Sequence, residues 1–205
     1  MREAANRQAH DRIAGIYDRR WQGYIEATVG RAVVSMELAG DERILDVAAG
    51  TGELIRRLRE RHPGLSAVGA DLSFEMLCQA VGKLSAREQW VQASSAELPF
   101  VDGTFDWVVC VNSFHCFREP ERSLQQMRRV LRPGGRLLLL DWCDDYLICK
   151  LCGLWLRWRD DAFYQAYTSE ACRHRLQAAG FTMNDEHRFR AGWLWGMVQF
   201  IATRS

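Results

Sequence analysis

Two aspartates and two glycines in the first half of the chain have the types and spacing of a ligand-binding turn. Asp46 lies near the end of one short apolar run, and Asp71 ends the next. Gly50 and Gly52 follow the first run, where they can adopt backbone angles closed to other residues and let a ligand lie against the main chain. Asp71 is placed to accept hydrogen bonds from both hydroxyls of a ribose. The pattern predicts a site for a cofactor that contains adenosine.

A strand–helix–strand unit must position these residues. Residues 53–61 carry apolar side chains at helical spacing, and His62-Pro63-Gly64 ends that helix. The apolar runs before and after the helix are short enough to be buried strands. Asp46 and Asp71 would then end neighbouring strands of one sheet and lie close together.

The residues after Gly50 distinguish between adenosine cofactors. A dinucleotide site requires Gly-x-Gly-x-x-Gly/Ala, so that the helix packs closely and its first turn faces a pyrophosphate. Ile55 occupies the third position here, and Glu53 would repel a diphosphate from the first turn of the helix. S-adenosylmethionine has a cationic sulfonium, an amine and no phosphate. Acidic surroundings at Asp46 and Glu53 therefore favour it over NAD.

Three later segments extend this pattern and carry a resemblance to a known family. They are 91–100 (VQASSAELPF), 102–111 (DGTFDWVVCV) and 132–141 (RPGGRLLLLD). With these motifs in order, the chain from about Tyr17 to Trp142 resembles the class I S-adenosylmethionine-dependent methyltransferases, especially the group that includes ubiquinone and menaquinone C-methyltransferases. The resemblance implies an α/β, Rossmann-like doubly wound sheet of seven strands. Most strands would be parallel, a C-terminal strand antiparallel, and helices would cover both faces.

The resemblance also implies a set of cofactor contacts. Asp71 would bind the ribose, while Leu72 and Met76 would flank the adenine. Ser94 stands where the family commonly has an aspartate, so its hydroxyl would bond to the adenine amino group without charge. Ala48 stands where many relatives have glycine. The expected cofactor-binding residues are Tyr17, Asp46, Ala48, Gly50, Gly52, Asp71, Leu72, Met76, Ser94, Ser95 and Asn112.

Two of these residues have a second interpretation that is purely structural. Tyr17 follows a segment that resembles the family's leader helix, so its ring would lie near the sulfonium and attract that cation. Tyr17 would equally serve as an aromatic packing anchor. Asn112 would line the methionine end of the pocket or cap the end of its strand. Residues 1–40 as a whole are expected to form an N-terminal helical cap.

The acceptor is expected to bind beside residues 142–168, an insert whose first part, 142–159, is rich in Trp, Leu and Cys. This part would form an apolar wall of the acceptor pocket, a contact with a second copy of the chain, or a weak contact with a membrane surface. The expected acceptor-pocket residues are His115, Trp142 and Tyr164. His115 is also the candidate general base, because an unperturbed imidazole titrates near neutrality; the alternative is a packed, hydrogen-bonded histidine.

Composition favours one cytoplasmic domain over residues 1–205 that binds no nucleic acid. A formal net charge of +1 provides no basic surface for phosphates. The first 20 residues are polar, unlike a signal peptide, and 142–159 is too short and too charged to cross a bilayer. Cys149 and Cys152, with Cys143 nearby, suggest a metal site. Zinc needs about four ligands, so packing of reduced thiols is favoured and no metal is expected.

The sequence therefore predicts a methyltransferase that uses S-adenosylmethionine, releases S-adenosylhomocysteine and modifies a small, apolar or aromatic acceptor at carbon, oxygen, nitrogen or sulfur. Two alternatives are a catalytically inactive S-adenosylmethionine-binding protein that acts through a partner, and an NAD-dependent oxidoreductase. The expected oligomeric state is a monomer or a homodimer. Strands at 181–187 and 193–203 are expected to close the sheet.

Overall fold

A seven-stranded sheet forms the centre of the computed structural model, which describes residues 2–84, 88–159, 163–192 and 195–205. The strand order is β3-β2-β1-β4-β5-β7-β6, and β7 runs antiparallel to the other six strands. The strands are β1 Arg43–Val47, β2 Ser66–Asp71, β3 Gln89–Gln92, β4 Phe105–Val111, β5 Leu131–Trp142, β6 Phe181–Ala191 and β7 Trp195–Arg204. This confirms the expected Rossmann-like doubly wound sheet.

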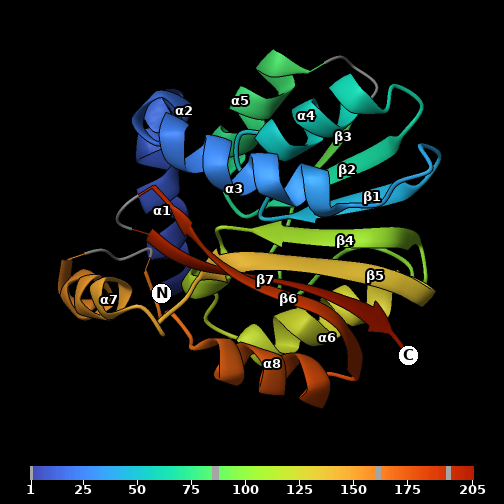
Figure 1. The fold of residues 1–205 in the computed structure, drawn as a ribbon. Helices are drawn as coiled ribbons and strands as arrows, with labels where there is room; N and C mark the ends of the chain where they lie inside the picture. Colours follow the sequence, from blue (N-terminus) through green and yellow to red (C-terminus); the bar gives the residue numbers. More distant parts are fainter. Residues whose placement is uncertain (1, 85–87, 160–162, 193–194) are drawn as a thin grey trace.

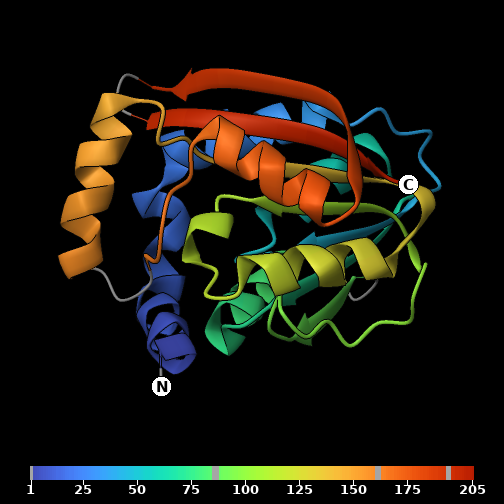
Figure 2. The same cartoon turned by 90° about the horizontal axis from the view of Figure 1, so that it is seen from below.

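Helices cover both faces of the sheet (Figures 1 and 2). One face carries α3, α4 and α5, and the other carries α6 and α8. The helices are α1 Arg2–Ile13, α2 Tyr17–Arg20, α3 Gln22–Ser35, α4 Glu53–Arg61, α5 Phe74–Lys83, α6 Pro120–Val130, α7 Leu147–Arg159 and α8 Ser169–Ala178, with short 3₁₀ helices η1 Ala14–Ile16 and η2 Phe114–Cys116. No helix of the described segments has the length and apolar character needed to cross a membrane.

The central strands contain continuous apolar runs, at 107–111 in β4 and 137–140 in β5, as expected for strands that are buried on both faces. Val108 and Leu139 lie in the core cluster that also contains buried residues of α6 and α8. The neighbouring residues Val109 and Leu138 lie in the cluster that contains buried residues of α3 and α4. This alternation fixes the register of the sheet and so places the ends of β1, β2 and β4 beside one another.

Boundaries at the C-terminal end differ from the expectation. β6 continues to Ala191, beyond the expected end at residue 187, because an edge strand can expose alternate polar side chains to water. The start expected at residue 193 for the last strand lies outside the described residues, and β7 is described from Trp195. The helix expected at 53–61 is α4, with the expected bounds.

Candidate cofactor and acceptor site

The carboxyl ends of β1, β2 and β4 border a cavity of about 370 Å³. It lies where the strand order reverses between β1 and β4, the position at which open α/β sheets bind ligands. Nine of the eleven residues expected to bind the cofactor line it: Tyr17, Ala48, Gly50, Asp71, Leu72, Met76, Ser94, Ser95 and Asn112. A smaller cavity of about 60 Å³ shares Tyr17, Ala48, Gly50 and Asn112 with the first and adds Asp46. The two cavities therefore adjoin along the glycine loop.

The loop after β1 is held in a tight left-handed turn. Ala48, Gly50 and Gly52 all have positive φ, at 59°, 55° and 76°. A Cβ on Gly52 would lie 2.7 Å from the Trp90 ring and 2.9 Å from Ala80. Gly52 lines neither cavity in the described part of the chain. The lack of a side chain at Gly52 instead allows Trp90 and Ala80 to pack closely beneath the loop.

Asp71 is oriented by the backbone of the same loop. One carboxylate oxygen accepts a hydrogen bond from the Gly50 N–H at 2.7 Å, and the other accepts one from the Ser73 N–H at 2.8 Å. Burial raises the pKa of Asp71, while these two hydrogen bonds oppose the shift. Each oxygen retains acceptor capacity toward the cavity. The geometry suits a pair of neighbouring hydroxyls.

Asp46 has a different environment. Its side chain is 3% exposed and lines the smaller cavity. None of the hydrogen bonds or ion pairs formed among the described residues involves its carboxylate. Burial, and then the charge of Asp71, raise its pKa well above the ordinary value. A buried carboxylate of this kind attracts a cationic ligand, because a positive charge would offset the cost of burial.

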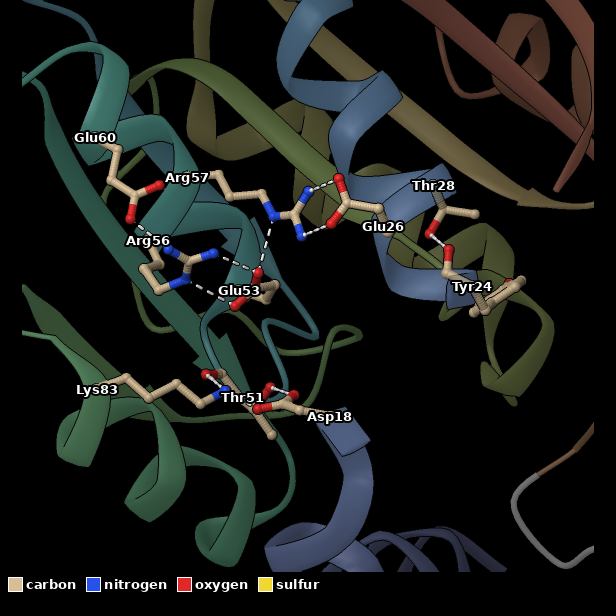
Figure 3. Close-up of polar contacts among 10 residues, drawn as sticks. All are labelled: Asp18, Tyr24, Glu26, Thr28, Thr51, Glu53, Arg56, Arg57, Glu60 and Lys83. Atoms are coloured by element: carbon tan, nitrogen blue, oxygen red, sulfur yellow. Dashed lines mark hydrogen bonds and ion pairs between the residues drawn. The ribbon is translucent and has the colours of Figure 1, made fainter. Parts of the chain in front are cut away.

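Glu53, the second acidic residue of the loop, is neutralised within the protein. Arg56 and Arg57 contact its carboxylate at 2.7 and 2.8 Å (Figure 3). Burial raises its pKa, but these hydrogen bonds outweigh the burial and lower the pKa to about 2. Arg57 also pairs with Glu26 of α3 at 2.6 Å. Arg57 thus joins α4 to α3. Of Asp46 and Glu53, only Asp46 lacks a cationic partner among the described residues.

Tyr17 and Asn112 stand where the two cavities meet. Asn112 has a φ of 60° and directly follows β4. Its Oδ1 accepts a hydrogen bond from the Tyr24 hydroxyl at 2.8 Å, and its Nδ2 donates one to the Thr28 hydroxyl at 2.7 Å. Asn112 therefore lines the cavity, and its side chain joins the end of β4 to α3. Tyr17 opens α2, which is tied to the glycine loop through Asp18 and Thr51 (Figure 3).

His115 and Trp142 lie behind the cavity wall rather than on it. Their rings stack with centroids 4.6 Å apart, and neither residue belongs to the lining formed by the described residues. The His115 Nδ1 lies 2.7 Å from Asp141 Oδ1. Burial alone would lower the pKa of His115, but the charge of Asp141 raises it well above the ordinary value. The pair is an internal ion pair.

Tyr164 is the acceptor-pocket candidate that does line the cavity. The His115 carbonyl accepts hydrogen bonds from the backbone N–H of Tyr164 at 3.0 Å and of Gln165 at 2.9 Å. The Arg118 guanidinium lies over the Tyr164 ring, 5.0 Å from its centre. His115 thus supports the backbone that carries Tyr164.

Several lining residues were missed by the sequence. Asn6, Arg7 and His10 come from α1, and a group at 116–119 follows η2. Asn6 Nδ2 donates to the Cys116 carbonyl at 3.2 Å, which joins these two segments. No pattern predicts these contacts, because α1 is polar on all sides and lacks an apolar face that would indicate how it docks.

Two of the three cysteines of the insert, Cys143 and Cys149, are packed against the sheet. The Cys149 Sγ accepts the Gly196 N–H at 3.1 Å and is fully buried. Cys143 is buried beside Asp145. In the described segments no group of three or more His, Cys, Asp or Glu side chains could hold a metal ion.

The sheet order and the crevice define a Rossmann-like protein that binds a nucleoside cofactor, and comparisons with known proteins narrow this class. Residues 45–139 match the family model described as a methyltransferase domain. A demethylmenaquinone methyltransferase of Thermus thermophilus is 44% identical over 104 residues, which cover 49% of this chain and 47% of that protein. A ubiquinone/menaquinone biosynthesis C-methyltransferase of Syntrophotalea carbinolica is 37% identical over 150 residues, covering 66% of this chain and 60% of that protein.

Solved structures support the same fold. A methyltransferase in complex with the Trm112 methyltransferase activator of Haloferax volcanii has a TM-score of 0.84 at 18% identity, covering 95% of this chain and 97% of that one. An S-adenosylmethionine-dependent methyltransferase of Thermotoga maritima has a TM-score of 0.79 at 16% identity, and the match covers 97% of this chain and 99% of that one. The chain is therefore similar to the class I S-adenosylmethionine-dependent methyltransferases, and the matched methyltransferase domain spans residues 45–139. It spans about half the length of the curated relatives it matches first.

Proposed function

We propose that the protein transfers a methyl group from S-adenosylmethionine to a small acceptor with apolar or aromatic character. The observation that carries this proposal is the pair of acidic side chains in the crevice. Asp71 is held for hydroxyl groups by two backbone N–H groups, and Asp46 is buried without a cationic partner among the described residues. S-adenosylmethionine has a ribose and a cationic end, and so matches both.

The proposed contacts follow the order of the cavity lining. Asp71 binds the ribose, and Leu72, Met76 and Ser94 surround the adenine. Asp46 faces the cationic methionine portion in the smaller cavity, which adjoins the first. Tyr17, which lines both cavities, places its ring near the sulfonium. The Ser94 hydroxyl oxygen accepts the Ala96 N–H at 3.3 Å, and as an acceptor it also suits the adenine amino group.

Methyl transfer requires little chemistry from the protein. The acceptor atom displaces the sulfur from a carbon that the sulfonium already activates, and S-adenosylhomocysteine is released. Holding the two reactants in line supplies much of the rate, and no covalent enzyme intermediate is needed. We assign His115 a positioning role, because its ring is engaged by Asp141 and its carbonyl holds the backbone of Tyr164.

The names of the relatives suggest the acceptor class. The relatives in Thermus thermophilus and Syntrophotalea carbinolica are named for menaquinone and ubiquinone biosynthesis. We therefore propose an aromatic, quinone-type acceptor that is methylated on a ring carbon. Phe117 and Tyr164 line the cavity and suit such a ring. We place the activity in the cytoplasm, in a monomer or homodimer; the seven cysteines are unpaired, as in a reducing compartment.

Calorimetric titration with S-adenosylmethionine, S-adenosylhomocysteine and NAD, each against the purified protein, tests the proposal. We expect binding of the first two at micromolar concentrations and no binding of NAD. Demethylated quinols, simple phenols and a polar amine would then be offered as acceptors, with transfer of labelled methyl as the readout. Binding of NAD alone would contradict the cofactor assignment. Binding of S-adenosylmethionine without transfer to any acceptor would favour the inactive, partner-dependent alternative.

A further inference from the structure

The helix α7 presents an apolar face to solvent. Leu147, Leu151, Leu154 and Trp155 are 71%, 58%, 54% and 59% exposed. Their spacing of four, three and one residues places them on one side of the helix. Both views show α7 at one end of the molecule, with no other helix or strand drawn on its outer side (Figures 1 and 2). The outer face of α7, defined by these four residues, is the largest group of exposed large apolar side chains on one described element.

The opposite side of α7 is anchored, so the helix cannot turn its outer face inward without breaking contacts. Cys149 is fully buried, and its sulfur is bonded to the backbone of Gly196 in β7. Gly153 faces the Phe163 ring, which would lie 3.4 Å from an added Cβ. The exposure of the outer face is therefore built into the fold.

The charged residues of α7 are all basic. Lys150 and Arg159 are exposed in the structure, and Arg157 is the third charged residue of the helix sequence. On a helical projection Lys150 and Arg159 fall on opposite flanks of the outer face. The Arg159 guanidinium lies over the Trp155 ring, 5.6 Å from its centre. The helix itself carries no carboxylate; Asp144 and Asp145 precede it and Asp160 and Asp161 follow it in the sequence, and Asp145 is engaged by Ser169 and Arg188. An apolar centre that carries Trp and Leu and is bordered along the helix by cations matches the boundary between acyl chains and anionic headgroups.

We propose that the outer face of α7 docks onto the surface of an anionic phospholipid bilayer, with the helix lying in the plane of the interface. This inference extends the proposed function, because an apolar acceptor would be dissolved in that bilayer. The path inward is short: Phe163 packs against Gly153 of α7, and the next residue, Tyr164, lines the cavity. Docking would bring the acceptor side of the cavity close to the lipid.

Sedimentation with sucrose-loaded vesicles tests the proposal. The vesicles would contain phosphatidylcholine alone or with phosphatidylglycerol, and the wild type would be compared with Leu151→Gln/Trp155→Gln. A matched control is Val34→Gln/Val101→Gln, which changes two apolar residues that are 69% and 78% exposed elsewhere. We expect the wild type and the control to bind phosphatidylglycerol vesicles, and the α7 variant to bind about tenfold or more weakly. Binding should weaken with added salt and with Lys150→Gln/Arg159→Gln.

Two results would overturn the proposal. One is absence of wild-type binding to either vesicle. The other is equal binding by the wild type and the α7 variant. If the wild type forms a dimer but does not bind vesicles, and the α7 variant is a monomer, the outer face of α7 would instead be assigned to contact with a second copy. Circular dichroism and urea denaturation of the same variants show that each is folded. Vesicle binding does not depend on S-adenosylmethionine, so failure of the proposed function would be seen separately.

Discussion

Asp46 and Asp141 are both buried carboxylates near the ends of parallel strands, yet their surroundings differ. Both are 3% exposed. The oxygens of Asp141 contact the backbone N–H of His115, the His115 ring and the backbone N–H of Trp142, each at 2.7 Å. Asp46 has no such contact among the described residues and faces a cavity. One carboxylate is hydrogen-bonded within the protein, and the other is the carboxylate that we propose for the ligand.

The largest expected effect is a loss of stability on removal of the Asp141 carboxylate, whose oxygens are hydrogen-bonded within the protein. Asp141→Ala would leave a buried histidine and two backbone N–H groups without their acceptor. We expect the free energy of unfolding to fall by about 3–5 kcal/mol. Urea denaturation followed by circular dichroism measures this loss. Glu37→Ala, which removes an exposed carboxylate paired with Arg136 at 3.3 Å, is the control and should change stability by less than about 1 kcal/mol. A similar small change for Asp141→Ala would refute its structural role.

The carboxylate assigned to the ribose should affect binding more than folding. Asp71→Ala would leave the ribose hydroxyls without their acceptor, so we expect affinity for S-adenosylmethionine to fall by about 1–3 kcal/mol. Asp106→Ala is a matched control, because Asp106 also accepts a backbone N–H, from Arg43 at 2.8 Å, but lies at the opposite end of the sheet. Calorimetry should find its affinity unchanged. Equal affinities for all three proteins would contradict the proposed contact between Asp71 and the ribose.

The His115–Asp141 pair also predicts a pH dependence. The raised pKa of His115 means that the folded protein holds this proton more tightly than the unfolded chain. The resulting stabilisation is complete below the unfolded value of about 6.5 and disappears as pH rises through the folded value. The stability difference between wild type and His115→Gln should therefore shrink as pH rises above neutrality. A constant difference across this range, or one that grows, would contradict the ion pair. His174→Gln, at an exposed position of α8, is the control.

Local sequence predicts the surroundings of Asp46 better than those of Asp141. The glycine loop, Asp46 and Asp71 could be predicted because a strand, a tight turn and a helix place them within 26 residues of each other. The pairing of Asp141 with His115 joins a strand end to a preceding 3₁₀ helix, and no periodic pattern predicts it. Trp142 was expected in the acceptor pocket, but its indole Nε1 donates to the Tyr24 hydroxyl at 2.7 Å in α3 instead.

The neighbours of Glu53 in the sequence contradict the expectation that its carboxylate is available to a cationic cofactor. Arg56 and Arg57 lie three and four residues after Glu53, the spacing at which side chains on a helix meet. That spacing already predicts that Glu53 is neutralised, and the structure places both guanidinium groups on its carboxylate. Of Asp46 and Glu53, Asp46 is therefore the carboxylate that remains available to a cationic cofactor.

Titration of wild type and Asp46→Asn with S-adenosylmethionine, over a range of pH, tests most directly whether the Asp46 carboxylate binds the cationic part of the cofactor. The variant keeps the shape of the side chain and removes its charge. We predict that the wild-type affinity rises with pH, because the cation favours the ionised form of a carboxyl with a raised pKa. The variant should bind about tenfold or more weakly, without that pH dependence, and should be no less stable to urea. Equal affinity at every pH would show that Asp46 is not held for the cofactor.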